Sequence, residues 1–365
     1  MNYKIPIYQP ELDGNEKKYV NECLDTNWIS SRGEFIKKFE DQFSKFIGVK
    51  HAVSCSNGTV ALHLALVTLG IGHGDEVIVP SFTYIASVST IVIAGATPIF
   101  VDSLEDTWQL DPMHVEKKIT SKTKAIMAVH LYGHPCDMDS LVAIAKKYNL
   151  FLIEDCAEAF GSKFKDKHVG TFGDISTFSF YGNKTITTGE GGMLVTNDET
   201  LYDRAYHLRM HGLAKYPEYW HDVIGFNYRM TNICAALGLA QLENAQNKIE
   251  RKRKLAEMYN SKLVGLPVYP HRQHPDVFHS YWMYSILVDT PDIREKLRDH
   301  LRKNLIETRP TFYPVHTMPM FAQKYQKLPV AESLGWRGIN LPSWPGLTEY
   351  QIDDIAKCIQ DFFNR

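Results

Sequence analysis

An apolar segment that ends in carboxylates lies near the middle of the chain and reads Leu150-Phe151-Leu152-Ile153-Glu154-Asp155. The apolar residues do not alternate with polar ones, as expected for a strand buried on both faces of a parallel sheet. Short runs of β-branched or aromatic residues recur on both sides of this segment, at residues 76–79, 98–101, 125–129, 175–180 and 193–196. We expect a strand at each of these six positions.

Stretches long enough for helices, such as residues 60–69 and 138–147, alternate with these runs, whereas a glycine-rich loop joins the last two. This alternation predicts an α/β fold with an open, mostly parallel sheet and helices on both faces. Ligands of such sheets bind outside the carboxyl ends of the strands. The candidates at those ends are residues 80–84, Asp102, residues 130–134, residues 155–158 and residues 179–184.

The length of 365 residues predicts about two domains. The pattern changes near Met230, where apolar residues at helical spacing predict one long helix that bridges the two domains. A further strand is expected over residues 280–288. We therefore expect a large α/β domain over residues 1–245 and a small α+β domain over residues 246–365.

Composition argues against several classes of protein. The 40 Lys and Arg residues nearly balance the 42 Asp and Glu residues, so no basic field favours nucleic acid. No apolar run approaches the roughly 20 residues of a membrane span. Residues 1–6 contain no apolar core of a signal peptide, and the six cysteines form no C-x-x-C pair. We expect reduced thiols, a cytoplasmic location, and neither a nucleic-acid nor a membrane partner.

Two familiar ligand motifs find no support. The chain has no G-x-x-x-x-G-K-[ST] sequence, which disfavours a P-loop nucleotide hydrolase. His130 and His134 are four residues apart, but they follow a strand and bracket Tyr132-Gly133, so the helical spacing of a metal pair does not apply. We expect no metal site and interpret both histidines as polar residues at a strand end.

One pair of residues does predict chemistry. Lys184 leaves a strand at its carboxyl end and precedes the turn Gly189-Glu190-Gly191-Gly192, where its amine can form a Schiff base with an aldehyde cofactor. Asp155 ends an apolar strand, where a carboxylate is costly unless it meets a cation. A pyridinium nitrogen is such a cation, so the two residues together indicate pyridoxal phosphate. Taken singly, Asp155 could be a helix cap and Lys184 a surface lysine.

A phosphate site is expected nearby. Residues 56–59 (Ser-Asn-Gly-Thr) precede a helix, whose free N–H groups and dipole favour an anion. An ordinary capped helix explains these residues equally well. Ser179 could add a hydroxyl to the same phosphate, and Tyr84 could lie flat on the pyridine ring.

Taken together, these motifs resemble the DegT/DnrJ/EryC1/StrS sugar-nucleotide aminotransferases, over essentially the whole chain. The matching stretches are residues 28–33, 56–62, 80–84, 154–158, 183–192, 226–232 and 309–314. The resemblance implies the fold type I architecture of aspartate aminotransferase, pyridoxal 5'-phosphate as cofactor, and a homodimer whose active sites lie at the subunit interface.

The resemblance also implies roles for individual residues. Lys184 is the Schiff-base lysine, Asp155 holds the pyridine nitrogen, and Glu158 lies near the cofactor hydroxyl. The resemblance further implies that Tyr84 stacks on the ring and that Gly58, Thr59 and Ser179 bind the phosphate. Asn227 is implied to reach the phosphate of the other subunit. The residues implied to face the substrate are His211, Tyr313 and His316. An ordinary surface or core role explains the last three equally well.

The expected reaction is transfer of the amino group of L-glutamate to C4 of a nucleotide-linked keto sugar. Residues 219–222, 278–282 and 338–346 resemble the family members that act on GDP-4-keto-6-deoxy-D-mannose. A UDP- or dTDP-linked 4-ketohexose is an alternative acceptor. Sugar dehydration on the same cofactor is disfavoured by Lys184, which relatives with that activity replace by histidine. A non-catalytic regulatory protein is disfavoured by the joint presence of Lys184, Asp155 and Ser179.

Overall fold

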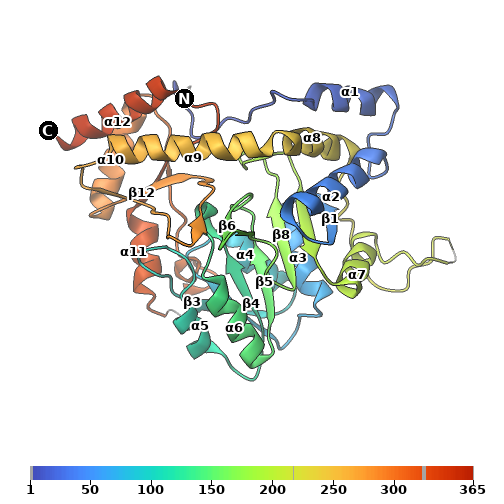
Figure 1. The fold of residues 1–365 in the computed structure, drawn as a ribbon. Helices are drawn as coiled ribbons and strands as arrows, with labels where there is room; N and C mark the ends of the chain where they lie inside the picture. Colours follow the sequence, from blue (N-terminus) through green and yellow to red (C-terminus); the bar gives the residue numbers. More distant parts are fainter. Residues whose placement is uncertain (1–2, 217, 323–325, 365) are drawn as a thin grey trace.

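The computed structural model describes residues 3–216, 218–322 and 326–364. Its centre is a seven-stranded sheet in the order β1-β9-β8-β5-β4-β2-β3, in which β9 alone runs antiparallel to its neighbours (Figure 1). The strands are β1 (His51–Cys55), β2 (Glu76–Pro80), β3 (Thr97–Val101), β4 (Thr123–Val129), β5 (Phe151–Asp155), β8 (Ile175–Ser179) and β9 (Gly192–Thr196). The six expected strands and the α/β class are confirmed.

Each face of this sheet supplies a different core, because successive side chains of a strand point to opposite sides. Val77 and Val79 of β2 pack under α3 (Gly58–Thr68), α4 (Ile85–Ile93) and α7 (Glu199–Arg209). Ile78 packs on the other side with α5 (Pro112–Lys118) and α6 (Met138–Tyr148). Farther along that second side, α2 (Glu34–Ile47) and α8 (Asn232–Glu243) cover β8 and β9. Burial on both faces explains why the strands read as continuous apolar runs.

The carboxyl-terminal part of the chain forms a second, smaller unit. Its sheet has the order β10-β12-β14-β13 and packs against α9, α10 and α12 around a separate core. The elements are α9 (Ala245–Lys262), β10 (Val268–Pro270), β12 (Tyr284–Val288), α10 (Pro291–Lys303), β13 (Arg309–Pro310), α11 (Pro329–Arg337), β14 (Gly338–Leu341) and α12 (Glu349–Phe363). Ile5 joins this core and pairs with Ile306, so the start of the chain also belongs to it.

The bridge between the two units is two helices, not one. Figure 1 shows α8 and α9 running end to end along the top of the molecule. Asn244 adopts a non-helical conformation (φ −107°, ψ 14°) and separates them. Ile249 packs in the core below β8, whereas Leu255 and Tyr259 pack in the small unit. Apolar periodicity continues across Asn244, which is why the sequence predicted a single helix.

The strand expected over residues 280–288 begins only at Tyr284. Tyr281 has φ +50°, which no extended strand contains, and residues 280–283 run instead beside the turn at Gly133. The prediction was therefore wrong for the first four residues. This departure from the strand places Trp282 near the carboxyl ends of β5 and β8.

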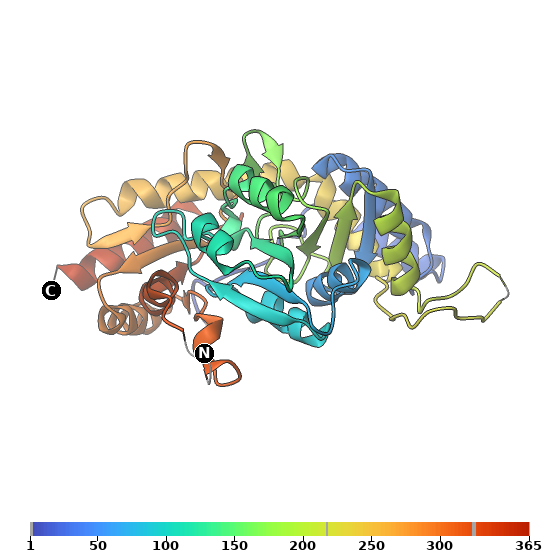
Figure 2. The same ribbon diagram turned by 90° about the horizontal axis from the view of Figure 1, so that it is seen from below.

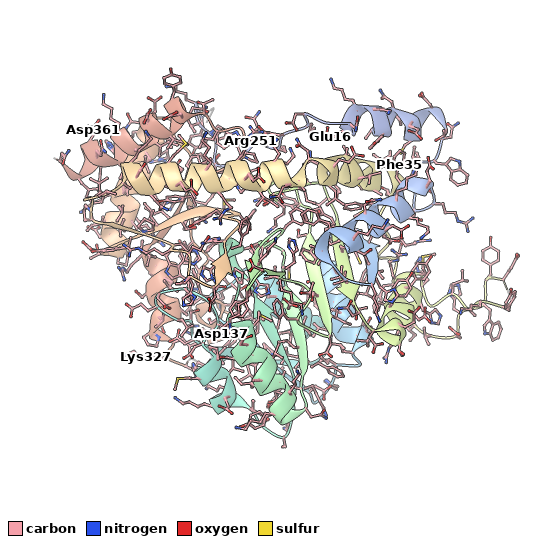
Figure 3. The ribbon with its side chains drawn as sticks, in the orientation of Figure 1. Glu16, Phe35, Asp137, Arg251, Lys327 and Asp361 are labelled. Atoms are coloured by element: carbon pink, nitrogen blue, oxygen red, sulfur yellow. The ribbon has the colours of Figure 1, made fainter. Side chains whose placement is uncertain are left out.

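Two further features lie at the periphery of the described structure. A third sheet in the order β11-β6-β7 is formed by β6 (Lys163–Phe164), β7 (Lys167–His168) and β11 (Val277–Phe278). Helix α1 (Glu16–Asp25) precedes α2, and Arg251 on α9, labelled in Figure 3, pairs with Glu11 just before α1 at 2.9 Å. Within the described ranges, no helix is both long and apolar enough to span a membrane.

An arm projects from the body of the molecule after α7 (Figure 2). We define the arm as residues 210–216 and 218–226. Its described apolar side chains are largely open to solvent, with exposed fractions of 91% for Tyr216, 91% for Tyr219 and 92% for Ile224. Several large apolar side chains exposed on one segment are a common feature of interaction sites.

Candidate active site

A cavity of about 530 Å³ opens at the carboxyl ends of β5 and β8, where the sequence predicted the ligand site. It is lined by seven of the residues proposed to hold the cofactor: Gly58, Thr59, Tyr84, Asp155, Glu158, Ser179 and Lys184. A second cavity, of about 590 Å³, lies beside Arg209 and Arg229 and contains none of the residues that the sequence assigned to a site. The first cavity is therefore the candidate active site.

Lys184 is the reactive amine of this cavity. Its side chain is 13% exposed, and Nζ lies 4.0 Å from Oε1 of Glu158. Burial lowers the pKa of Lys184 from its ordinary value, while the carboxylates of Glu158 and Asp155 oppose that change. A lowered pKa increases the fraction of neutral amine, which is the nucleophilic form. Tyr8 donates a hydrogen bond to the backbone carbonyl of Lys184 at 2.6 Å and fixes this part of the loop.

Asp155 is buried at the last position of β5 and is held by two donors. The hydroxyl of Ser87 donates to Oδ2 at 2.8 Å, and the backbone N–H of Ala157 donates to Oδ1 at 3.1 Å. Burial nevertheless raises the pKa of Asp155, because these hydrogen bonds and Lys184 only partly compensate for lost hydration. A carboxylate in this environment gains from a cationic partner, and a protonated pyridine nitrogen fits that requirement.

Glu158 lies one turn beyond Asp155. It is 5% exposed, and burial raises its pKa above the ordinary value. Lys184 opposes this shift, as does the backbone N–H of Tyr132, which donates to Oε2 at 2.8 Å. Tyr132 can present this N–H because its own backbone is left-handed, with φ +56°. Burial therefore favours the protonated form of Glu158, and the nearby Lys184 opposes this effect.

The N-terminus of α3 forms a cradle suited to a phosphate. Asn57 caps the helix by accepting from the backbone N–H of Val60 at 3.0 Å, and the helix itself leaves the N–H groups of Gly58 and Thr59 unused. Ser179 lies so close to Gly58 that a Cβ atom there would lie 2.8 Å from the Cβ of Ser179. Only glycine leaves this space open, so the residues present fit pyridoxal phosphate.

Aromatic side chains form the walls of the cavity. Tyr84, the residue before α4, is 55% exposed, and its ring centroid lies 5.5 Å from that of Phe312. Trp282 closes another side and donates from Nε1 to the carbonyl of Asn183 at 2.8 Å. A planar aromatic ligand is matched by such walls.

Asn227 and His211 lie outside this cavity, at the base of the arm. The backbones of Met210 and Asn227 form an isolated bridge, so the two ends of the arm meet there. Arg229 joins both residues, because its Nε donates to Oδ1 of Asn227 at 2.9 Å and its Nη2 lies 3.3 Å from Nε2 of His211. The structure thus brings Asn227 and His211 together, but not with the site of their own chain.

Tyr313 and His316 also do not line the cavity. The Tyr313 ring packs on Trp336 at 4.8 Å, and its hydroxyl accepts from Arg294 at 3.4 Å. His316 is 1% exposed, and its Nδ1 lies 2.6 Å from the hydroxyl of Ser81. Their substrate-side roles remain predictions from the family resemblance.

The strand-end histidines take part in buried hydrogen bonds. His130 accepts from the backbone N–H of Cys136 at Nδ1, and its Nε2 therefore donates to Glu154 at 3.0 Å. His130, Glu154 and Cys156 lie close enough to share a metal ion, but Glu154 already accepts from three backbone N–H groups of residues 170–173. We interpret this cluster as support for the end of β5. His134 belongs to a different cluster, with His271 and His279.

Two residues of the site were missed by the sequence reasoning. Ser87 lies three residues after Tyr84 on α4, and only the hydroxyl at that spacing could have suggested it. Trp282 was placed in a strand, where its side chain had no expected relation to Lys184. No local signal reveals that contact.

Fold and site together define the class of the protein. A mostly parallel seven-stranded sheet that presents a buried aspartate, a lysine and a phosphate cradle to one cavity is the arrangement of a fold type I, pyridoxal-phosphate-dependent enzyme. Sequence comparison makes the identity more specific. The DegT/DnrJ/EryC1/StrS aminotransferase family matches residues 10–360, and the chain belongs to this family. It is a pyridoxal-phosphate-dependent sugar aminotransferase.

Similar proteins cover the chain from end to end. GDP-perosamine synthase from Escherichia coli O157:H7 is 64% identical over 360 residues, which is 99% of each chain. GDP-perosamine synthase from Vibrio cholerae is 52% identical over 364 residues, again 99% of each chain. The solved structure of Helicobacter pylori PseC, an aminotransferase involved in the biosynthesis of pseudoaminic acid, is 29% identical, covers 99% of each chain and superimposes with a TM-score of 0.94.

Proposed function

We propose that the chain transfers the amino group of L-glutamate to C4 of GDP-4-keto-6-deoxy-D-mannose, giving GDP-perosamine and 2-oxoglutarate. The observation that carries the proposal is 64% identity over 99% of the chain to a GDP-perosamine synthase. The cavity with Lys184, Asp155 and Glu158 supports the amino transfer. The product would supply an O-antigen or another surface polysaccharide.

Different residues of the chain have different roles in amino transfer. When bound, pyridoxal phosphate stores the amino group between the two substrates and takes up the electrons of the broken bond. Asp155 keeps a proton on the pyridine nitrogen, and Ser87 orients the Asp155 carboxylate for that task. Nζ of Lys184 moves the proton from Cα of glutamate, because the lysine is already held beside the reacting atoms.

The remaining residues bind and orient. Gly58, Thr59 and Ser179, which line the cavity, would hold the phosphate through backbone N–H and hydroxyl groups. Tyr84 would cover one face of the ring, and Glu158 would lie near the cofactor hydroxyl.

We further propose that the chain acts as a homodimer with shared active sites. Asn227 and His211 lie outside the cavity of their own chain and beside the exposed apolar arm, so a second copy is the partner that gives them a role. Asn227 would reach the partner's cofactor phosphate. Burial of the arm against a second copy would remove its exposed tyrosines from water.

We propose a cytoplasmic location as well. Cys55 and Cys156 are buried free thiols, a state that persists in reducing compartments. We place the domain boundary near residue 245, where the two helices of the bridge meet.

The proposal is tested with purified enzyme, L-glutamate and a panel of GDP-, UDP- and dTDP-linked 4-keto sugars. We expect the GDP-linked 4-keto-6-deoxymannose to be converted fastest, with one 2-oxoglutarate released for each amino sugar. Faster conversion of a UDP- or dTDP-linked sugar would refute the proposed acceptor while leaving amino transfer intact. Absence of 2-oxoglutarate with every sugar would refute L-glutamate as the donor.

A further inference from the structure

The nearest aromatic surface to the reactive amine is the indole of Trp282. Nζ of Lys184 lies 3.8 Å from the centroid of this ring, whereas 4.0 Å separates it from Oε1 of Glu158. Trp282 is only 5% exposed, so water does not compete strongly for the lysine at this face. An ammonium group over a buried indole is stabilised by the negative charge density of the ring face.

Several contacts hold the indole in this position. Its Nε1 donates to the carbonyl of Asn183, the residue before Lys184, so the ring and the lysine are fixed to the same loop. The indole also stacks on Tyr132, with the ring centroids 6.1 Å apart and 8° between the ring planes. Phe312 extends this stack and contacts Tyr132 at 5.3 Å. The ring therefore cannot turn away without disrupting its neighbours.

The backbone that carries Trp282 adopts an uncommon conformation. Tyr281 has φ +50°, and a Cβ atom on Gly133 would lie 2.9 Å from the backbone nitrogen of Trp282. His279 supports this turn, because its Nδ1 accepts from the N–H of Tyr281 at 3.0 Å and the two rings stack at 3.7 Å. Local strain that the surroundings maintain is typical of functional sites.

The carboxylates described in the cavity make no hydrogen bond to the amine of Lys184. Asp155, Glu158 and Glu190 line the cavity together with the tyrosines Tyr84 and Tyr181. Asp155 is engaged by Ser87 and Ala157, and Glu158 is beyond hydrogen-bond distance of Lys184. A released ammonium group that formed a tight ion pair would return slowly to the reaction. An indole face stabilises the same group without a directional bond.

We propose that Trp282 is a positioning residue whose indole face receives the ε-ammonium group of Lys184 each time this lysine is released from the cofactor. The inference rests on the proposed role of Lys184 in amino transfer. Loss of the indole removes a stabilisation of the charged amine, so the amine of Lys184 becomes neutral at lower pH.

The test uses full-length enzyme in its pyridoxamine phosphate form, which leaves Lys184 unattached. Acetylation of Lys184 by acetic anhydride is followed from pH 5 to pH 10 by peptide mapping. Trp282→Leu removes the ring face and Trp282→Phe keeps a smaller one. We expect Trp282→Leu to accelerate labelling at low pH by about 3- to 30-fold, and Trp282→Phe to lie between it and wild type.

Trp108→Leu is the matched control. Trp108 is as buried as Trp282, at 3% exposed, but it stacks on His271 at 4.2 Å instead of facing Lys184. We expect its labelling profile to equal that of wild type. If Trp282→Leu does not fold, the comparison of Trp282→Phe with wild type decides the question. An unshifted profile in the folded Trp282 variants, or an equal shift in Trp108→Leu, would overturn the proposal.

Borohydride reduction of the wild-type pyridoxal phosphate enzyme separates this proposal from the one on which it rests. A pyridoxyl group on a lysine other than Lys184 would refute the role of Lys184, whatever the acetylation profiles show. A pyridoxyl group on Lys184 with unshifted profiles would refute only the role of Trp282.

Discussion

Acidification from pH 7.5 to pH 5 is expected to destabilise the folded chain through a cluster of three buried histidines. His134, His271 and His279 are 1%, 2% and 0% exposed, and their ring centroids lie 4.9 to 5.3 Å apart. Burial lowers the pKa of His134 to about 4 and lowers those of the other two well below the ordinary value. Protonation of any of them places a charge among buried aromatic rings.

The difference in proton binding between the unfolded and folded chain determines whether acid lowers or raises the free energy of unfolding. An unfolded chain protonates His134 near pH 6.5, whereas the folded chain resists until about pH 4, so the unfolded state binds more protons in this range. The stabilisation is complete above pH 6.5 and is lost as the pH falls toward 4. The pKa of His134 falls from 6.5 in the unfolded chain to about 4 in the folded chain, which corresponds to about 3 kcal/mol of unfolding free energy. About 2 kcal/mol of this stabilisation is lost by pH 5. His271 and His279 act in the same direction.

The assay is urea unfolding at pH 7.5 and pH 5 at constant ionic strength and protein concentration. His134→Gln removes the titration, and its amide can replace the contacts to the Pro135 carbonyl and the His274 N–H. We expect its free energy of unfolding to fall by about 2 kcal/mol less than that of wild type between the two pH values. His73→Gln, at an exposed histidine, is the control and should behave as wild type. An equal loss in His134→Gln and wild type would refute the reasoning.

Four further substitutions test the site. Lys184→Ala should abolish turnover while the protein still folds and retains pyridoxamine phosphate, which absorbance after gel filtration measures. Asp155→Asn should slow both half-reactions by orders of magnitude, and a normal single-turnover rate with glutamate would contradict its role. Ser87→Ala removes the hydroxyl that opposes the raised pKa of Asp155 and should slow both half-reactions about 10- to 100-fold, with recovery in Ser87→Thr. Asn227→Ala should weaken cofactor retention and dimer formation, which sedimentation with and without pyridoxal phosphate measures. A loss of thermal stability with unchanged cofactor affinity would leave Asn227 only a local structural role.

Local sequence determined the sheet and the two principal residues of the site. A strand buried on both faces must be apolar throughout, so β2, β4 and β5 can be identified without tertiary information. Asp155 and Lys184 could be located for the same reason, because Asp155 ends such a strand and Lys184 lies in the loop that follows β8, and both positions are at the ligand edge of the sheet.

Tertiary packing decided the contacts that control these residues. Ser87 reaches Asp155 across 68 positions of sequence, and Trp282 reaches the loop of Lys184 across 99. Both contacts depend on how separate elements pack, and the second also requires the left-handed backbone of Tyr281. Strand propensity favoured a continuous strand there, but the close approach of the Gly133 turn overrides it.

The histidines illustrate the same division. The sequence placed His134 and His316 near strand ends or in a substrate loop, yet it could not determine whether either ring was exposed. Imidazole is compatible with both surface and interior, so its environment is set by the elements that pack around it. In the folded chain, Nδ1 of His316 lies 2.6 Å from the hydroxyl of Ser81, Nδ1 of His134 lies 2.7 Å from the carbonyl of Pro135, and both rings are buried.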